Sequence, residues 1–316
     1  MADTSPAAVI EASSLSRSYG DRRALNQFSL NVPSGTVFGL LGPNGSGKST
    51  FLALVAAMER PAEGELRVFG NPPAAAAKGR VGMVFQENAQ DPSMTCIELL
   101  SLAGRMQGLG GANLRARAVE LLATFGLADR ASDPIAKLSG GMRRRLEVAR
   151  ALVHDPELVL LDEPTTGIDP DERRNLWSAL LGSARKSRTI LLATNDLSEA
   201  DAVCEQVAFI REGSLVASGT PAELKAGLRR ESVTVELAGD SANDLSRLAS
   251  LAGAGDVILD GETVRITCDD SAALIPKLFE LVPGRIRSVN VRPSTLEDAY
   301  FRHIGRRLAR PADVAS

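Results

Sequence analysis

The sequence predicts an α/β protein with two domains, a larger one built on a mostly parallel β-sheet and a small α+β domain of ferredoxin-like order. Apolar, strand-like runs alternate with amphipathic helical stretches up to about residue 231, which is the pattern of a parallel sheet covered by helices. Two of the runs, at 158–164 and 189–194, indicate buried strands, and the first is an uninterrupted apolar run that ends in acids, as in strands buried on both faces. Beyond residue 231 the order becomes strand, helix, strand, strand, helix, strand, which is that of a split βαββαβ unit.

Each element follows from periodicity and turn residues. The strands expected in the first domain are 9–15, 24–32, 36–42, 64–70, 80–86, 158–164 and 189–194. The helices expected there are 49–58, 95–128 with a break at 108–111, 142–155 and 171–186. The second domain is expected to hold strands at 233–239 and 285–292, a hairpin at 256–268 that turns at Asp260-Gly261, and helices at 244–253 and 271–282. A helix at 220–231 marks the boundary, so we expect domains at 1–227 and 228–316.

Composition excludes several functional classes. The chain has 316 residues with 36 Lys and Arg against 39 Asp and Glu, so it lacks the excess of positive charge typical of a nucleic-acid binder. No apolar run is long enough to cross a bilayer, and the N-terminus does not resemble a signal peptide. The three cysteines (Cys96, Cys204 and Cys268) have no metal-ligand spacing and are interpreted as buried thiols in a reducing compartment. We therefore expect a cytosolic protein that needs a separate partner chain for any role at a membrane.

A glycine-rich loop lies between the strand expected at 36–42 and the helix expected at 49–58. It matches G-x-x-x-x-G-K-[ST], the phosphate-binding loop. Its glycines let backbone N–H groups approach phosphate oxygens, while the helix N-terminus adds positive potential. Lys48 is expected to reach the β- and γ-phosphates and Ser49 to bind Mg²⁺, which makes ATP and Mg²⁺ the expected ligands. The alternative is an ordinary turn. The loop comprises Gly42, Pro43, Asn44, Gly45, Ser46, Gly47, Lys48, Ser49 and Thr50.

Two acidic residues end the apolar run at 158–164. Asp162 stands at the tip of the expected strand, where an acid holds Mg²⁺ in phosphate-loop proteins. Glu163 follows it and is positioned to orient or deprotonate an attacking water. Surface acids at a strand end are the alternative, and the upstream loop argues against it.

The segment Leu138-Ser139-Gly140-Gly141-Met142 resembles the LSGGQ signature of ATP-binding cassette (ABC) ATPases, with Met142 in place of Gln. It follows the phosphate loop and precedes 158–164, as in that family, and the resemblance covers roughly residues 8–225. It implies an ABC-type core with a helical subdomain at about 87–137, whose groove receives a coupling helix of the membrane partner. It also implies a head-to-tail pair of cassettes, in which Ser139, Gly140 and Gly141 cap the γ-phosphate held by the other chain.

The resemblance assigns further residues. Tyr19 occupies the position of the aromatic that stacks on adenine, with an ordinary strand-end tyrosine as the alternative. Gln86 resembles the glutamine that senses Mg²⁺ and the membrane partner, and Gly167-Ile168-Asp169 resembles the loop that reaches across the dimer. Asn195 departs from the family, because a histidine usually stands at this position. Since asparagine cannot take up a proton near pH 7, we expect ATP binding to be kept and hydrolysis to be slowed.

The C-terminal stretch from Ser294 to Tyr300, with Gly305-Arg306, resembles the ending of ATPases of daunorubicin-resistance type exporters. An amphipathic docking helix is the plainer interpretation, and both can hold. The favoured hypothesis is the ATPase subunit of an exporter of drug-like or lipid-like substrates. It would lie at the inner face of the cell membrane on a separate permease, paired with a second cassette in a homodimer or heterodimer. An importer ATPase is one alternative. A soluble non-transport ABC ATPase acting on DNA or ribosomes is another, and the single cassette, the short 87–137 segment and the balanced charge argue against it.

Overall fold

The chain divides into two compact units, Met1–Ser218 and Gly219–Ser316. The computed structural model describes residues 8–76, 79–86, 90–182, 188–226, 228, 231–238, 245–251, 253–260 and 263–305. The division lies ahead of the helix α8 (Pro221–Ala226), whereas the expected boundary at residue 227 lies behind it. The predicted helix at 220–231 is wrong at its C-terminal end, because Glu231 pairs with Cys268 and Pro293 as the first residue of a strand.

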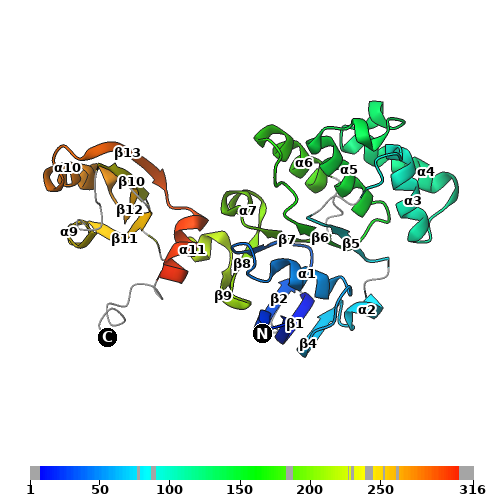
Figure 1. The fold of residues 1–316 in the computed structure, drawn as a ribbon, viewed down its shortest axis with the longest axis horizontal. Coiled ribbons are helices and arrows are strands. Elements are labelled where there is room, and N and C mark those ends of the chain that lie inside the picture. Colours follow the sequence, from blue (N-terminus) through cyan, green and yellow to red (C-terminus); the bar gives the residue numbers. More distant parts are fainter. Residues whose placement is uncertain are drawn as a thin grey trace, which may run out of the picture. The chain divides into compact units, whose positions relative to one another are not determined.

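The first unit is built on a six-stranded sheet of order β5-β6-β7-β3-β8-β9 (Figure 1). The pairs from β5 to β8 are parallel, which confirms the predicted mostly parallel sheet. Every residue of β3, β6 and β7 is buried, as expected of strands covered on both faces. The strands are β3 (Val37–Leu41), β5 (Val81–Val84), β6 (Leu158–Asp162), β7 (Thr189–Thr194), β8 (Gln206–Arg211) and β9 (Ser214–Gly219). The last two were not among the predicted elements.

A second, antiparallel sheet of order β2-β1-β4 packs against the same core. Its strands are β1 (Ala8–Tyr19), β2 (Arg22–Pro33) and β4 (Glu63–Val68). The helix α1 (Lys48–Val55) lies between the two sheets, where Phe28 of β2 meets Phe51 of α1 edge to face at 5.0 Å between ring centroids. The periodicity of the sequence indicated these three strands. No local sequence feature indicates that they form a sheet separate from the main one.

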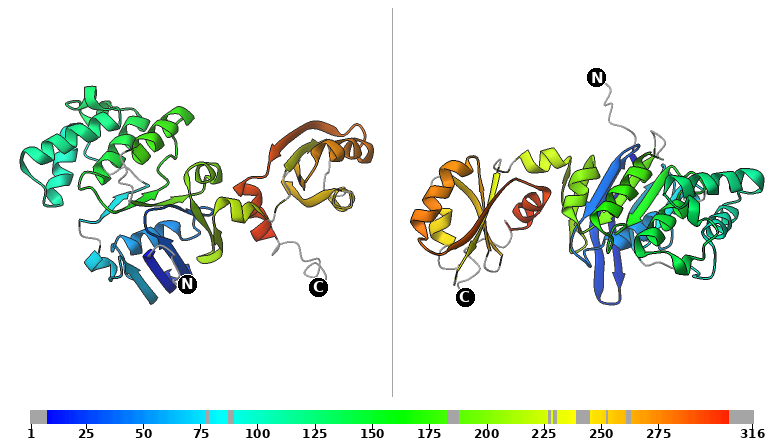
Figure 2. Two further views of the ribbon diagram at one scale, coloured as in Figure 1. Left: turned by 180° about the vertical axis from the view of Figure 1, so that it is seen from behind. Right: turned by 90° about the horizontal axis from the view of Figure 1, so that it is seen from above.

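Helices complete the first unit. The predicted break at 108–111 is confirmed, because one helix ends at Met106 and the next begins at Gly111. In Figure 1 and in the view from behind in Figure 2, α3 and α4 lie away from β1, β2 and β4. The remaining elements are α2 (Pro73–Ala76), α3 (Cys96–Met106), α4 (Gly111–Thr124), η1 (Ala128–Arg130), η2 (Ile135–Lys137), α5 (Gly140–Ala151), α6 (Pro170–Gly182) and α7 (Leu197–Val203). Residues 87–89 of the expected helical subdomain and 183–186 of the expected helix lie outside the described residues.

The second unit holds an antiparallel sheet of order β11-β12-β10-β13. The elements follow the expected order: β10 (Glu231–Leu237), α9 (Leu245–Ala249), β11 (Ala254–Asp260), β12 (Thr263–Cys268), α10 (Ser271–Leu281), β13 (Ile286–Pro293) and α11 (Leu296–Gly305). Its core joins alternate residues of the strands, such as Val264 and Ile266, to the apolar sides of α9 and α10. Gly261 of the expected hairpin turn and Arg306 of the C-terminal motif lie outside the described residues.

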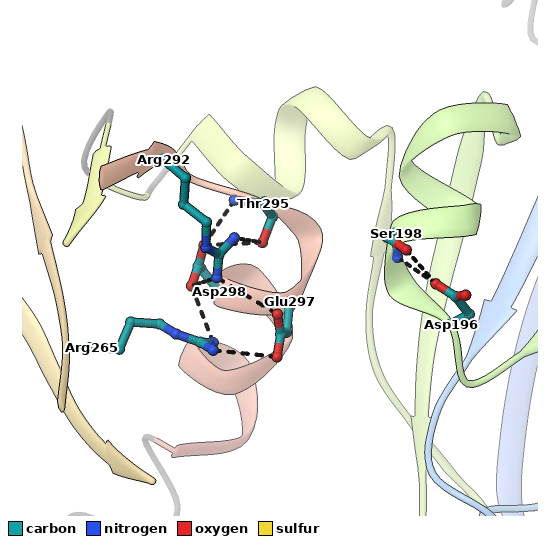
Figure 3. Close-up of polar contacts among 7 residues, drawn as sticks. All are labelled: Asp196, Ser198, Arg265, Arg292, Thr295, Glu297 and Asp298. Carbon is teal, nitrogen blue, oxygen red and sulfur yellow. Dashed lines mark hydrogen bonds and ion pairs between the residues drawn. The ribbon is translucent and has the colours of Figure 1, made fainter. Parts of the chain in front are cut away.

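The other face of this second sheet is polar and contacts α11 through charges (Figure 3). Asp298 is 2% exposed and accepts hydrogen bonds from the N–H and hydroxyl of Thr295, at 2.9 and 3.0 Å. It also pairs with Arg265 of β12 at 3.4 Å and with Arg292 of β13 at 3.3 Å. One buried carboxylate therefore caps the helix and ties it to two strands.

Candidate functional site

The glycine-rich loop connects the buried strand β3 to α1, which begins at Lys48. Gly45 and Gly47 have φ values of 78° and 111°, which disfavour any residue with a Cβ. A Cβ on Gly47 would lie 2.4 Å from the carbonyl oxygen of Ala24, and one on Gly42 would lie 2.2 Å from that of Ile210. The loop can pack this tightly only with glycine at these positions. It thereby presents the free N–H groups at the start of α1 to an anion.

Lys48 lies at the centre of the loop and is only 5% exposed. Its ammonium donates to the carbonyl oxygens of Gly42 at 2.7 Å and Pro43 at 3.2 Å. It also lies 3.5 Å from Oε1 of Glu163. The predicted cation and the predicted catalytic acid are therefore direct neighbours.

Asp162 ends β6 and Glu163 follows it, and both are buried, at 4% and 6% exposure. Burial raises the pKa of both carboxyls, opposed at Asp162 first by a hydrogen bond from Ser49 and at Glu163 first by the charge of Lys48. Glu163 has φ 47° while its N–H donates to Ala193 at 2.8 Å. A left-handed backbone at a non-glycine residue costs on the order of 1 kcal/mol, so the fold holds this residue in a strained conformation that directs it toward the loop.

The donor set fits Mg²⁺. Oδ1 of Asp162 is buried without a hydrogen-bond partner among the described residues, which is costly unless a ligand satisfies it. The Ser49 hydroxyl already contacts Asp162, and Gln86 lines the same hollow. Oxygen ligands of this kind are those that Mg²⁺ prefers.

An open hollow of about 500 Å³ brings the predicted residues together. It is lined by Tyr19, Arg22, Ala24, Asn44, Gly45, Gly47, Lys48, Ser49, Thr50, Gln86 and Glu163. Sequence reasoning missed Arg22, which donates to the carbonyl oxygen of Gly45 at 2.9 Å. No sequence pattern marks it, because it contacts the loop from a separate strand.

Tyr19 lies at the mouth of this hollow with 44% of its surface exposed. Its hydroxyl donates to Glu59 at 2.6 Å, and the guanidinium of Arg17 lies 5.1 Å from the ring centroid. Arg17 also donates to Glu59 at 3.0 Å. The ring is thus fixed at its hydroxyl end, while its exposed surface is available for stacking.

Asn195 follows β7, as predicted, and its side-chain amide donates to Asn44 of the loop at 3.2 Å. The next residue, Asp196, caps α7 by accepting from the N–H groups of Ser198 and Glu199, and it accepts from the Ser198 hydroxyl as well (Figure 3). Asn195 therefore lies against the phosphate loop on a firmly capped turn.

Glu199 forms a buried hydrogen-bond cluster beneath Asn195, and sequence reasoning gave it no role. Its carboxylate, 3% exposed, accepts from the Thr165 hydroxyl at 2.5 Å, from Nε1 of Trp177 at 2.8 Å and from the Thr194 hydroxyl at 3.1 Å. Thr165 lies two residues after Glu163, and Thr194 precedes Asn195. The cluster therefore connects two segments that border the site.

Ser139 caps α5, and its hydroxyl accepts from the N–H of Met142 at 3.2 Å. Ser139 and Gly140 are exposed and Gly141 is half-buried. None of these three is among the described residues that line the hollow. The structure thus brings most of the predicted residues together and leaves the LSGGM segment on a separate surface.

Comparison with known proteins identifies the family. The family model described as ABC transporter matches residues 25–166. The chain is 35% identical to the daunorubicin/doxorubicin resistance ATP-binding protein of Streptomyces peucetius, over 99% of this chain and 96% of that protein. It is 38% identical to a Nod factor export ATP-binding protein of Cupriavidus metallidurans, over 95% and 99%. The chain belongs to the ABC transporter family of ATP-binding proteins.

Solved ABC structures confirm the ABC-type α/β fold over 67–69% of this chain. An ATP-binding subunit of an ABC transporter matches with a TM-score of 0.63 and 27% identity, over 69% of this chain and 92% of that one. A dimeric ATP-binding cassette with ADP and phosphate matches with a TM-score of 0.61 and 25% identity, over 67% and 98%. The recognition of the family from LSGGM is therefore confirmed, and ATP hydrolysis is the activity expected of the family.

Proposed function

We propose that this chain is the ATP-hydrolysing subunit of an ABC exporter, which drives a drug-like or lipid-like substrate outward through a separate membrane permease. The proposed ATPase activity rests on one observation. A single hollow is lined by Lys48, Ser49, Gln86 and Glu163. The export direction rests on the relatives, whose names describe drug resistance and Nod factor export. These relatives align over nearly the whole chain, including the second unit.

ATP is held along the hollow by different chemistry at each end. Adenine stacks on the exposed ring of Tyr19. The phosphates lie on the N–H groups of the loop, which comprises residues 42–50, and Lys48 compensates their charge. The buried surroundings of Lys48 strengthen this attraction relative to water.

Ser49, Gln86 and Asp162 would hold Mg²⁺, which would neutralise negative charge that develops on the phosphate. Glu163 orients the attacking water and accepts its proton. Burial raises the pKa of Glu163, which brings its basicity closer to what proton abstraction near neutral pH requires. The charge of Lys48 beside it opposes this rise in the pKa.

A second cassette completes each site. Ser139, Gly140 and Gly141 begin α5 on a surface that is open to a partner, and the N–H groups of this helix start suit a phosphate. We propose that they cap the γ-phosphate in the facing chain, a homodimer or a heterodimer of cassettes. The dimeric cassette with ADP and phosphate supports this arrangement.

The membrane is reached through the permease. No described helix is long and apolar enough to cross a bilayer. We propose that the protein lies at the inner membrane face, with its helical subdomain on the permease and its C-terminal domain (228–316) contacting the second cassette. Asn195 donates to the loop but cannot carry a proton, so turnover is slow relative to a site with histidine.

The ATPase is tested by Mg²⁺-dependent phosphate release from wild type, Lys48→Ala and Arg67→Ala. Lys48→Ala is expected to lose turnover. The control removes an exposed cation that pairs with Glu65 on β4 and is expected to match wild type. Glu163→Gln is expected to bind ATP and to elute as a dimer with ATP in size-exclusion chromatography. Normal turnover by Lys48→Ala would refute the assignment of the loop.

Export is tested with the permease of the same transporter, produced together with this chain. Inside-out vesicles with both proteins are expected to accumulate an amphiphilic dye on addition of ATP, and vesicles with Lys48→Ala are not. Uptake by right-side-out vesicles that enclose ATP would instead indicate import.

A further inference from the structure

Arg144 lies in the second turn of α5 and is 4% exposed. Within the described part of the chain, each hydrogen bond of its guanidinium goes to a backbone carbonyl oxygen. Nε donates to Pro164 at 2.7 Å, and Nη1 to Phe85 at 2.6 Å. Nη2 donates to Asp162 at 2.8 Å and to Glu163 at 2.9 Å.

These four carbonyls belong to the segments that carry the proposed chemistry. Phe85 immediately precedes Gln86 after the end of β5, while Asp162 ends β6 and Glu163 follows it. The strained φ of 47° at Glu163 needs continuous support. A planar guanidinium with fixed donor directions provides that support to four acceptors at once, which the single ammonium of a lysine cannot do.

The same residue connects this region to the LSGGM segment. Ser139 caps the helix that carries Arg144, and a helix is rigid over so short a distance. Burial lowers the pKa of the Arg144 guanidinium, and Glu147, Asp162, Glu199 and Glu163 oppose this by their charge. The cation is therefore buried among carboxylates, where its loss would leave both charges and carbonyls uncompensated.

We propose that Arg144 is a positioning residue for ATP hydrolysis. It fixes Gln86 and Glu163 of the chain's own site relative to Ser139, which serves the facing site. This inference rests on the proposed ATPase function and its two-cassette site. A displacement of a catalytic group by about 1 Å can cost 10²-fold in rate. Loss of Arg144 should therefore lower kcat more than it raises KM, because the Lys48 loop that binds the phosphates remains in place.

Arg188 supplies the matched control. It is also 4% exposed and also donates to a backbone carbonyl, that of Pro156 at 3.0 Å, and to the carboxylate of Asp155 at 2.6 Å. These contacts lie before β6 begins at Leu158, at the end of the strand opposite to Asp162. Arg188→Gln therefore removes a buried guanidinium of the same kind without touching the catalytic end.

The experiment compares wild type, Arg144→Gln, Arg144→Lys and Arg188→Gln by Tm, by ATP affinity and by steady-state kcat and KM. Both glutamine variants are expected to lose Tm. Only the Arg144 variants should lose kcat, by about 10- to 100-fold, with KM and ATP affinity within about threefold of wild type. Arg144→Lys keeps the positive charge. If Arg144→Gln does not fold, the kcat of Arg144→Lys is compared with that of wild type and Arg188→Gln instead.

A kcat of the folded Arg144 variants within about threefold of that of Arg188→Gln would overturn the proposal, since the effect would then be one of stability alone. The proposal would also be overturned if the loss of kcat/KM in the Arg144 variants came entirely from a higher KM. Absence of turnover in wild type, or its persistence in Lys48→Ala, would refute the proposed ATPase instead, so the two failures are distinguishable.

Discussion

Replacing Glu199 by alanine is expected to destabilise the first unit by about 3–5 kcal/mol. The substitution removes the acceptor of three buried donors, from Thr165, Trp177 and Thr194. The rigid indole N–H cannot turn to another partner, and leaving it unpaired costs about 1–3 kcal/mol. The two hydroxyls can rotate but each loses a bond to a carboxylate, and the missing side chain leaves a void that adds to the cost.

Glu199→Gln is the matched control. Its remaining oxygen keeps the bonds to Thr165 and Trp177, which both go to Oε1. Its amide group faces the Thr194 hydroxyl, which can accept a further hydrogen bond besides the one from the N–H of Asp196. We expect a loss below about 1.5 kcal/mol.

The assay is urea unfolding followed by the fluorescence of Trp177, the chain's one tryptophan, with linear extrapolation to water. Trp177 is 5% exposed and its indole is part of the cluster, so its emission reports on this region. The reasoning would be refuted if the free energy of unfolding of Glu199→Ala lay less than about 1 kcal/mol below that of wild type, or equalled that of Glu199→Gln.

Other predictions concern the site itself. Asn195→His is expected to raise kcat about tenfold or more, because an imidazole can exchange a proton; an unchanged or lower rate in the ATPase assay contradicts this. Asp162→Asn is expected to have a higher Tm than wild type without nucleotide or Mg²⁺. Burial raises the pKa of Asp162, so its contribution to stability is full below the unfolded pKa and is lost as pH rises through the folded pKa. The advantage should therefore be larger at pH 8 than near the ordinary pKa value of 3.8 in thermal scans, and a constant difference would contradict the assigned cause.

The residues of the phosphate loop could be predicted because their chemistry is local. Gly42, Lys48 and Ser49 are adjacent in sequence, and the loop needs those residue types in that order. Asp162 and Glu163 were predicted for a related reason, since a buried strand that ends in acids is visible as a pattern. The family resemblance added Tyr19 and Gln86, which no local pattern singles out.

The supporting residues could not be predicted, because their partners are distant in sequence. Arg144 resembles its neighbours Arg143 and Arg145, and only the fold shows that its carbonyl partners lie on two strand ends. Arg22 and Glu199 likewise acquire their roles from contacts across the chain. The strands β8 and β9 were not predicted, although the apolar runs of β6 and β7 were recognised as strands.

The contact between α11 and its sheet has a consequence for shortened chains. Asp298 supplies the negative charge that faces Arg265 and Arg292. A protein cut after β13 would keep both arginines on a bare polar face and lose their counter-charge. Such a fragment should be less stable, because Arg265 and Arg292 then repel each other without the carboxylate that pairs with both.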